Sequence, residues 1–131
     1  MLGMLLSCAM PAAAQTRALD ECGRTASNAA EVARCLQLAQ STASDEMLGV
    51  FQDVERRLGQ RGPAPVRDAA VAALRTSQRD FERYVEGQCG FVHDLAGGGA
   101  LGVSAALACE TDLLRQRTAT LQSLLPRASA N

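Results

Sequence analysis

Apolar residues recur at alternating steps of three and four in three long stretches of this sequence, and that spacing most constrains the fold. It places apolar side chains along one side of an α-helix, and no stretch shows the period of two typical of a half-buried strand. The first stripe is Val32, Leu36, Ala39, Ala43, Met47, Val50, Val54 and Leu58. The second is Val66, Ala70, Leu74, Ser77, Phe81, Tyr84 and Val85, and the third is Leu107, Thr111, Leu114, Thr118, Leu121 and Leu125.

The residues around the first stripe predict the bounds of its helix. Ser27 and Asn28 are both good N-cap residues, because their side chains can accept a hydrogen bond from the first turn. The glycines between 59 and 62 mark the end of this helix, and Pro63 and Pro65 prevent its continuation. Residues 15–26, before the cap, are a polar lead-in.

The bounds of the other two predicted helices are less clearly marked in the sequence. The second helix is expected to begin close to Pro65 and to fray at Gly87 and Gly90. Residues 94–102 contain four glycines and are predicted to form the main loop of the protein. Pro126 and a small polar tail are expected to close the third helix.

Three such stripes can be buried only if the helices pack side by side. The sequence therefore predicts an all-α fold, a small helical bundle of about three helices, two of them long and antiparallel. The length of 131 residues suits one domain, assigned to residues 15–131. Aromatic residues make up only 3% of the chain, whereas Ala and Leu dominate its apolar set and favour helices.

The first fourteen residues carry no charge and end in three alanines before Gln15. This pattern predicts a secretory signal peptide, residues 1–14, cleaved after Ala14. The stretch is too short to span a bilayer, and no transmembrane span is expected. A lipoprotein signal, with Cys8 as the lipidated residue, is the alternative. Either reading places the protein in the periplasm or at the cell surface.

Four cysteines follow this segment: Cys22, Cys35, Cys89 and Cys109. An even number in a small exported domain indicates disulfides, and three pairings are possible. The sequential pairing closes the shortest loops, and each bridge would then stabilise the fold by about 3 kcal/mol. A metal site is disfavoured because no C-x-x-C occurs and His93 is the one histidine.

Composition also argues against several functions. The 13 basic and 14 acidic residues give no basic excess for nucleic acid. His93 has no neighbouring nucleophile and is expected to be a solvated loop residue, and adjacent acids such as Asp45 and Glu46 are expected to be surface charges. The glycines at 97–99 lack the Lys-Ser/Thr of a phosphate-binding loop. We therefore expect a binding protein with no catalytic residues, metal or cofactor, not an enzyme.

One block goes beyond general helical chemistry. It consists of Leu74, Arg75, Gln78, Arg79 and Phe81, then Cys89, a glycine-rich segment, Cys109, Arg117 and Leu121. This block resembles the LprI-type lysozyme inhibitors of bacterial envelopes, and the resemblance extends from about Cys22 to Leu125. The chain departs from the family pattern where Phe81 replaces a tryptophan, Leu48 and Phe51 replace Asn and Tyr, and Leu114 replaces a threonine.

The resemblance implies a periplasmic or surface protein that binds lysozyme and protects peptidoglycan. Inhibition of a glycosidase calls for an element that enters its cleft, and Phe91 to Leu101 is the candidate segment. The residues assigned to partner binding are Phe91, His93, Asp94, Gly97, Gly98 and Gly99. His93 would donate to a catalytic carboxylate, and Asp94 would meet arginines of a basic lysozyme.

Two alternatives remain beside this interpretation. The motif residues have a structural reading, in which Leu74, Phe81 and Leu121 form core and the three arginines pair with acids on neighbouring helices. The function has an alternative too, an envelope adaptor that binds another protein or a wall component without inhibiting lysozyme. The near-neutral net charge favours this adaptor, since an acidic excess is the simplest way to attract a basic enzyme.

Overall fold

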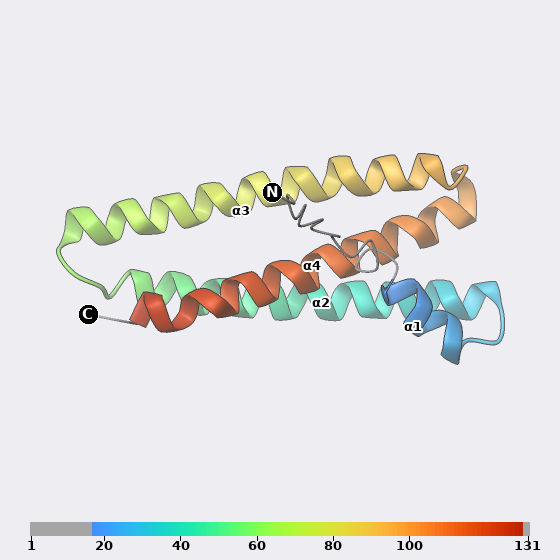
Figure 1. Ribbon diagram of the computed structural model, residues 1–131, viewed down its shortest axis with the longest axis horizontal. Helices are drawn as coiled ribbons and strands as arrows, with labels where there is room; N and C mark the ends of the chain where they lie inside the picture. The colour runs from blue at the N-terminus through green and yellow to red at the C-terminus, as the bar shows by residue number, and fades with distance from the viewer. Residues whose placement is uncertain (1–16, 130–131) are drawn as a thin grey trace, which may run out of the picture.

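The computed structural model describes residues 17–129, with side chains through residue 126, as four helices. Helix α1 spans Arg17–Thr25, α2 Ala29–Leu58, α3 Ala64–Leu95 and α4 Gly99–Ser129. The all-α prediction is confirmed, with four helices in place of about three. The predicted signal peptide lies outside the described residues. Three long helices form an elongated bundle, and the short α1 lies across one end of it (Figure 1).

Helix α4 is the centre of the bundle. It packs against all three other helices, whereas α2 and α3 make few contacts with each other. Figure 1 shows the reason: α4 begins beside the end of α3 and runs obliquely until it lies along the end of α2. The predicted third stripe therefore faces two helices, and Thr111, Leu114, Thr118 and Leu121 are all buried. The two buried hydroxyls donate to carbonyls one turn earlier in α4, so neither is left unpaired.

The start of α2 follows the predicted capping chemistry. The Asn28 carboxamide oxygen accepts from the Glu31 N–H at 3.0 Å, and the Glu31 carboxylate accepts from the Ser27 N–H at 2.7 Å. The first bond satisfies a donor that the first helical turn leaves without a partner, and the second holds the residue before the cap. At its other end, α2 stops at Leu58, before Gly59, as predicted.

Three sequence predictions about helix bounds are wrong. The lead-in is helical, because Ala18 and Cys22 lie one turn apart and are buried against α2 and α4. Helix α3 continues through Gly87 and Gly90 to Leu95, since a helix tolerates isolated glycines when its other side is packed. Helix α4 passes Pro126 and ends at Ser129, because a proline in the last turns costs few backbone hydrogen bonds.

The core forms in three parts along the bundle. The largest part, where α2, α3 and α4 meet, contains Ala43, Met47, Val54, Leu74, Leu114 and Leu121. A second surrounds Cys22 and Leu36 under α1, and a third surrounds Cys89, Cys109 and Leu113. Three members of the predicted second stripe are not core: Val66 is 64% exposed, Tyr84 is 51% exposed, and Ser77 is exposed as well. They lie on α3, which α2 barely covers.

Candidate functional site

The turn between α3 and α4 is much tighter than the predicted loop. Residues 96–98 alone separate the two helices. Gly97, Gly98 and Gly99 have φ values of 88°, 68° and 58°, which are left-handed conformations that glycine adopts without strain. The Gly98 N–H donates to the His93 carbonyl oxygen at 3.1 Å, and the Gly102 N–H donates to the Gly98 carbonyl at 2.9 Å. Consecutive backbone hydrogen bonds therefore join the end of α3 to the start of α4.

His93 is part of this junction. It lies in the last turn of α3, its side chain is 36% exposed, and its Nδ1 is 3.0 Å from the Asp94 carboxylate. Its ring lies against α4 at Gly102, where an added Cβ would be 2.8 Å from both His93 Cδ2 and the His93 carbonyl oxygen. The prediction that His93 lies in a loop is therefore wrong, whereas its predicted exposure to solvent holds in part. The missing side chain at Gly102 allows the two helices to approach this closely.

A buried disulfide fixes the two helices behind the turn. Cys89 of α3 is bonded to Cys109 of α4, and both residues are less than 5% exposed. Val85, Val92, Phe81 and Leu113 pack around the bridge. The predicted clamp at the base of the glycine segment is thus present. The bridge supports a hairpin of two helices in place of the predicted loop.

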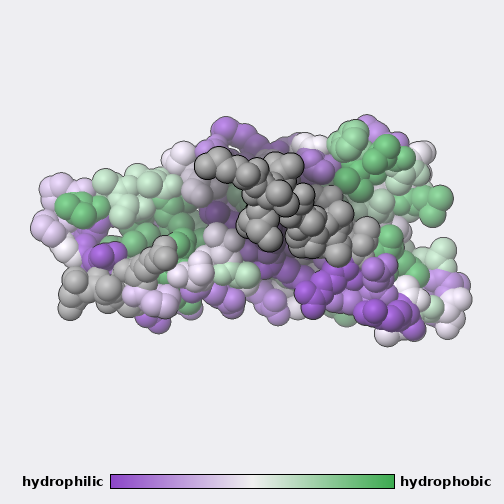
Figure 2. All heavy atoms as spheres, viewed as in Figure 1, coloured by the Kyte–Doolittle hydropathy of each residue, from purple (hydrophilic) through white to green (hydrophobic). Residues whose placement is uncertain are grey.

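Apolar side chains are exposed at the end of this hairpin. Phe91 is 60% exposed, Leu95 74%, Leu101 75% and Val103 48%. We call these four residues the tip. Figure 2 shows apolar surface gathered over this end of α3 and α4. Exposed leucines occur singly on most proteins, whereas four exposed apolar residues at one braced helical end form a candidate interaction surface.

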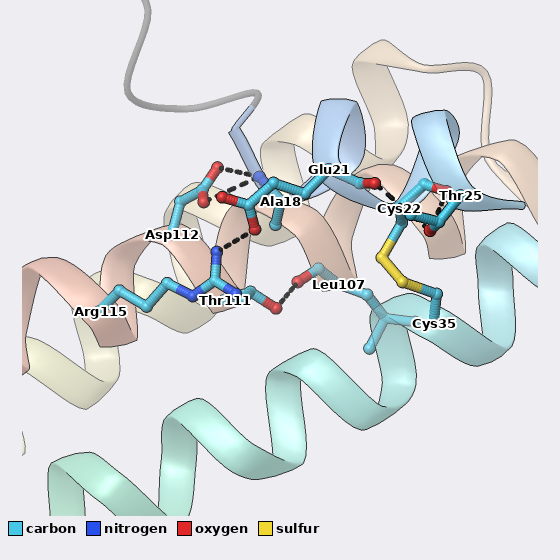
Figure 3. The surroundings of a disulfide bond; sticks show 9 residues. All are labelled: Ala18, Glu21, Cys22, Thr25, Cys35, Leu107, Thr111, Asp112 and Arg115. Carbon is cyan, nitrogen blue, oxygen red and sulfur yellow. Dashed lines mark hydrogen bonds and ion pairs between the residues drawn. A yellow bond between two sulfur atoms is a disulfide. The ribbon is translucent and has the colours of Figure 1, made fainter.

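The other disulfide anchors α1 at the same end of the bundle. Cys22 of α1 is bonded to Cys35 of α2, so the amino-terminal segment folds back onto α2, as predicted (Figure 3). The Asp112 carboxylate of α4 accepts the Ala18 N–H, with oxygens at 3.1 and 3.4 Å. Asp112 is 8% exposed, and burial raises the pKa of its carboxyl above the ordinary value, although the bond from Ala18 opposes this.

A second contact between α1 and α4 lies beside the first. The Arg115 guanidinium is 2.8 Å from the Glu21 carboxylate (Figure 3). The other oxygen of that carboxylate accepts from Arg17 at 3.1 Å. Hydrogen bonding to Arg115 holds the pKa of Glu21 below its ordinary value. Sequence reasoning missed α1 and this pair. The spacing of Ala18 and Cys22 was the available signal, but nine residues are too few for a convincing stripe.

A polar layer crosses the middle of the bundle, and we define it as Met47, Ser77, Gln78, Glu82 and Arg117. Gln78 is 7% exposed; its amide nitrogen donates to Met47 Sδ at 3.4 Å and Glu82 Oε1 at 3.1 Å. Its amide oxygen accepts from Arg117 Nε at 3.2 Å, and Arg117 also donates to Ser77 at 3.1 Å. The layer ties α2, α3 and α4 together at one level.

The matched range of a known family covers most of these features. A family model described as "Lysozyme inhibitor LprI" matches residues 20–121. The chain belongs to the LprI family. No curated protein and no solved structure was found to match it. In this LprI-family chain the matched range includes both disulfides, the polar layer and the whole turn between α3 and α4.

The motif residues of the LprI-family chain are mainly structural. Leu74 and Leu121 are buried, and Phe81 packs against two core clusters, with the Arg117 guanidinium 5.3 Å from its ring centre. Burial also lowers the pKa of Arg117 from its ordinary value. Of the three arginines, Arg75 alone pairs with an acid of a neighbouring helix, Glu55 of α2.

The prediction of acid pairing is wrong for the other two arginines. Arg117 bonds the neutral Gln78 and Ser77, and Arg79 donates to Thr76 of its own helix. The predicted partner-binding residues do lie together at the α3–α4 end, but four of the six are helical: Phe91, His93 and Asp94 belong to α3, and Gly99 begins α4. Among residues 17–129 there is no metal-binding cluster and no helix long and apolar enough to cross a membrane.

Proposed function

We propose that this LprI-family protein is exported to the bacterial periplasm or cell surface, binds lysozyme there and protects peptidoglycan from it. The observation that carries the proposal is the family match across residues 20–121. The two disulfides support export, because such bonds persist in oxidising compartments and not in the cytosol. Cleavage of the signal after Ala14 belongs to the same proposal.

The tip is the surface that we assign to lysozyme. A glycosidase cleft is concave and holds its two catalytic carboxyls, so an inhibitor must present a narrow projecting element. The α3–α4 hairpin end exposes Phe91, Leu95 and Leu101 and is fixed by the Cys89–Cys109 bridge and the glycine turn. A rigid element loses little conformational entropy on binding.

Local charge strengthens this assignment. The polar layer divides the described chain into two halves, and the half with the tip comprises residues 17–46, 79–95 and 99–116. This acidic half has eleven acidic and six basic residues, a net charge of −5. A basic enzyme is attracted to this half although the whole chain is nearly neutral. His93 is assigned to bracing the turn, since its ring lies against α4.

A lysis assay tests the function. Clearing of a peptidoglycan suspension by lysozyme is measured with increasing amounts of the exported protein, and saturable protection is expected. Leu95→Glu should lose most of that protection. The matched control is Leu38→Glu, a leucine 70% exposed on α2, outside the tip, which should protect fully.

Complete lysis at a large molar excess of the folded protein would contradict the proposed function. Capture of a specific envelope protein in that case, with no lysozyme bound, would favour the adaptor alternative. Mass spectrometry of the exported chain tests the processing step. A mass that begins at Gln15 is expected, and a lipid on Cys8 would contradict it.

A further inference from the structure

Charge is segregated along the bundle. Residues 47–78 and 117–126, which include Arg117 of the polar layer, form a basic half with six arginines and three acids, a net charge of +3. Its charged residues are Arg56, Arg57, Arg61, Arg67, Arg75 and Arg117, with Asp53, Glu55 and Asp68. The acidic half carries −5. The near-zero total thus hides two opposite charges at the two ends of one elongated molecule.

The basic half also contains an apolar groove. It lies near the turn that joins α2 and α3, is lined by residues of α2, α3 and α4, and has a volume of about 300 Å³. Its lining includes Val54, Leu58, Ala70, Ala73, Leu74 and Leu124. Figure 2 shows apolar surface at this end of the molecule and at the tip on the same face. The groove is therefore a second uncovered apolar site, at the opposite end from the tip.

We propose that the groove receives the tip of a second copy of this chain. A twofold axis across the middle of the bundle aligns two copies antiparallel and places each tip on the other copy's groove. Both contacts then form at once, and the assembly closes as a dimer. The same alignment sets each acidic half beside the partner's basic half, whereas parallel copies would place like charges together.

The pairing has consequences for the tip. In the dimer each tip is covered, so any partner that binds the tip competes with the second copy. Pairing itself does not depend on the identity of that partner, and it holds whether or not lysozyme is inhibited. Because the charged halves attract across an exposed interface, added salt should weaken the dimer; the screening length falls from about 8 Å at 0.15 M salt to about 3 Å at 1 M.

Sedimentation equilibrium of the exported protein at low and high salt tests the proposal. A concentration-dependent dimer is expected at low salt, with weaker association at high salt. Leu95→Glu at the tip and Ala73→Arg in the groove should each weaken dimerisation roughly tenfold or more, because each breaks both contacts of a homodimer. Both positions are exposed, so the variants should keep the parent's circular dichroism and melting temperature. Leu38→Glu should dimerise like the parent.

An equimolar mixture of the two weakened variants gives the sharpest test. One of the two contacts in their heterodimer joins a normal tip to a normal groove. The other brings the introduced carboxylate and the introduced guanidinium together, so association should return. A parent that stays monomeric at high concentration would overturn the proposal. A dimer insensitive to Ala73→Arg, or a mixture that stays monomeric, would overturn it as well, because either result excludes the reciprocal contact of tip and groove.

Discussion

At the acidic end of the bundle, two disulfides, a three-residue turn and an anchored short helix hold the chain together. At the basic end, neither bridge is present, and the helices are held mainly by the core around Val54 and Leu121. The covalent bonds thus lie where the core is thinnest. Short apolar clusters under α1 and behind the tip bury too little surface to order those segments alone.

The difference bears on function. A surface that must hold its shape while uncovered needs support from behind, and the tip receives it from the Cys89–Cys109 bridge. The groove at the other end is lined by residues of α2, α3 and α4 and has no disulfide behind it. Substitutions at the basic end should therefore alter stability through side-chain packing. Substitutions at the acidic end should alter it through the disulfides and the close approach of the backbones.

The largest expected effect lies at the basic end. Leu121 is fully buried in the core cluster that joins α2, α3 and α4. Leu121→Ala should lower the free energy of unfolding by about 4 kcal/mol, since the lost burial and the new cavity add together. Chemical denaturation measures this value. Leu38→Ala, at a leucine 70% exposed, is the control and should change stability little. A loss below about 1 kcal/mol for Leu121→Ala would show that the basic end is not held by its core.

The next effect separates the two ends. Replacing Cys89 and Cys109 together by Ala should lower the free energy of unfolding by about 3 kcal/mol. Hydrogen exchange should rise first in the last turns of α3 and the first turns of α4, while amides around Val54 keep their protection. Uniform loss of protection along α2 and α4 would instead indicate that the bridge stabilises the whole bundle as one unit.

A smaller effect concerns the close approach at the turn. Gly102→Ala should lower the free energy of unfolding by about 1–3 kcal/mol, because its Cβ would be 2.8 Å from the His93 carbonyl oxygen. Gly49→Ala in α2 is the matched control. A Cβ there has nothing within 4 Å, so the change should stabilise the helix by about 0.5–1 kcal/mol. If both substitutions changed the free energy of unfolding in the same direction, crowding at Gly102 would be excluded.

The comparison also shows what a sequence can predict here. The stripes in α2 and α4 are long and regular, so Leu36, Met47 and Leu121 were assigned to the core correctly. The cap at Asn28 was predicted from its own side chain. Both disulfides match the pairing of neighbouring cysteines. These features depend on residues near one another in the chain.

Features that depend on distant residues were missed. Helix α1 is anchored by Asp112 and Arg115, more than ninety residues away, and its own sequence is too short to predict it. The glycine segment was expected to be a loop because composition alone does not distinguish a flexible connection from a tight turn. The helices on both sides of this segment depend on the contact of His93 in α3 with Gly102 in α4. The role of Gln78 in the polar layer likewise depends on residues of two other helices.

The smallest expected effect is a pH dependence at the α1 anchor. Glu21 is bound by Arg115, and its pKa in the folded protein lies below the ordinary value of 4.5. Its contribution to stability is therefore fully present above pH 4.5 and is lost as the pH falls through the lower folded-state pKa. Glu21→Gln should lower the free energy of unfolding by about 0.5 kcal/mol at pH 7, a small loss because the Glu21 and Arg115 side chains are both partly exposed. Once Glu21 of the parent is protonated, the substitution should cost nothing.

The pH dependence of stability should have the opposite sign at Asp112, because burial raises the pKa of its carboxyl above 3.8. The contribution of Asp112 to stability is fully present below pH 3.8 and is lost as the pH rises through the higher folded-state pKa. Over that rise, Asp112→Asn should therefore become more stable relative to the parent. The asparagine oxygen can still accept from the Ala18 N–H. Asp112→Ala should instead cost about 1 kcal/mol, because that N–H loses its partner. Thermal melts of the three variants between pH 3 and pH 8 measure these differences. Parallel pH profiles for Glu21→Gln and Asp112→Asn would show that the two carboxylates do not differ in environment, and the anchor would then depend on the Cys22–Cys35 bridge and the buried Ala18.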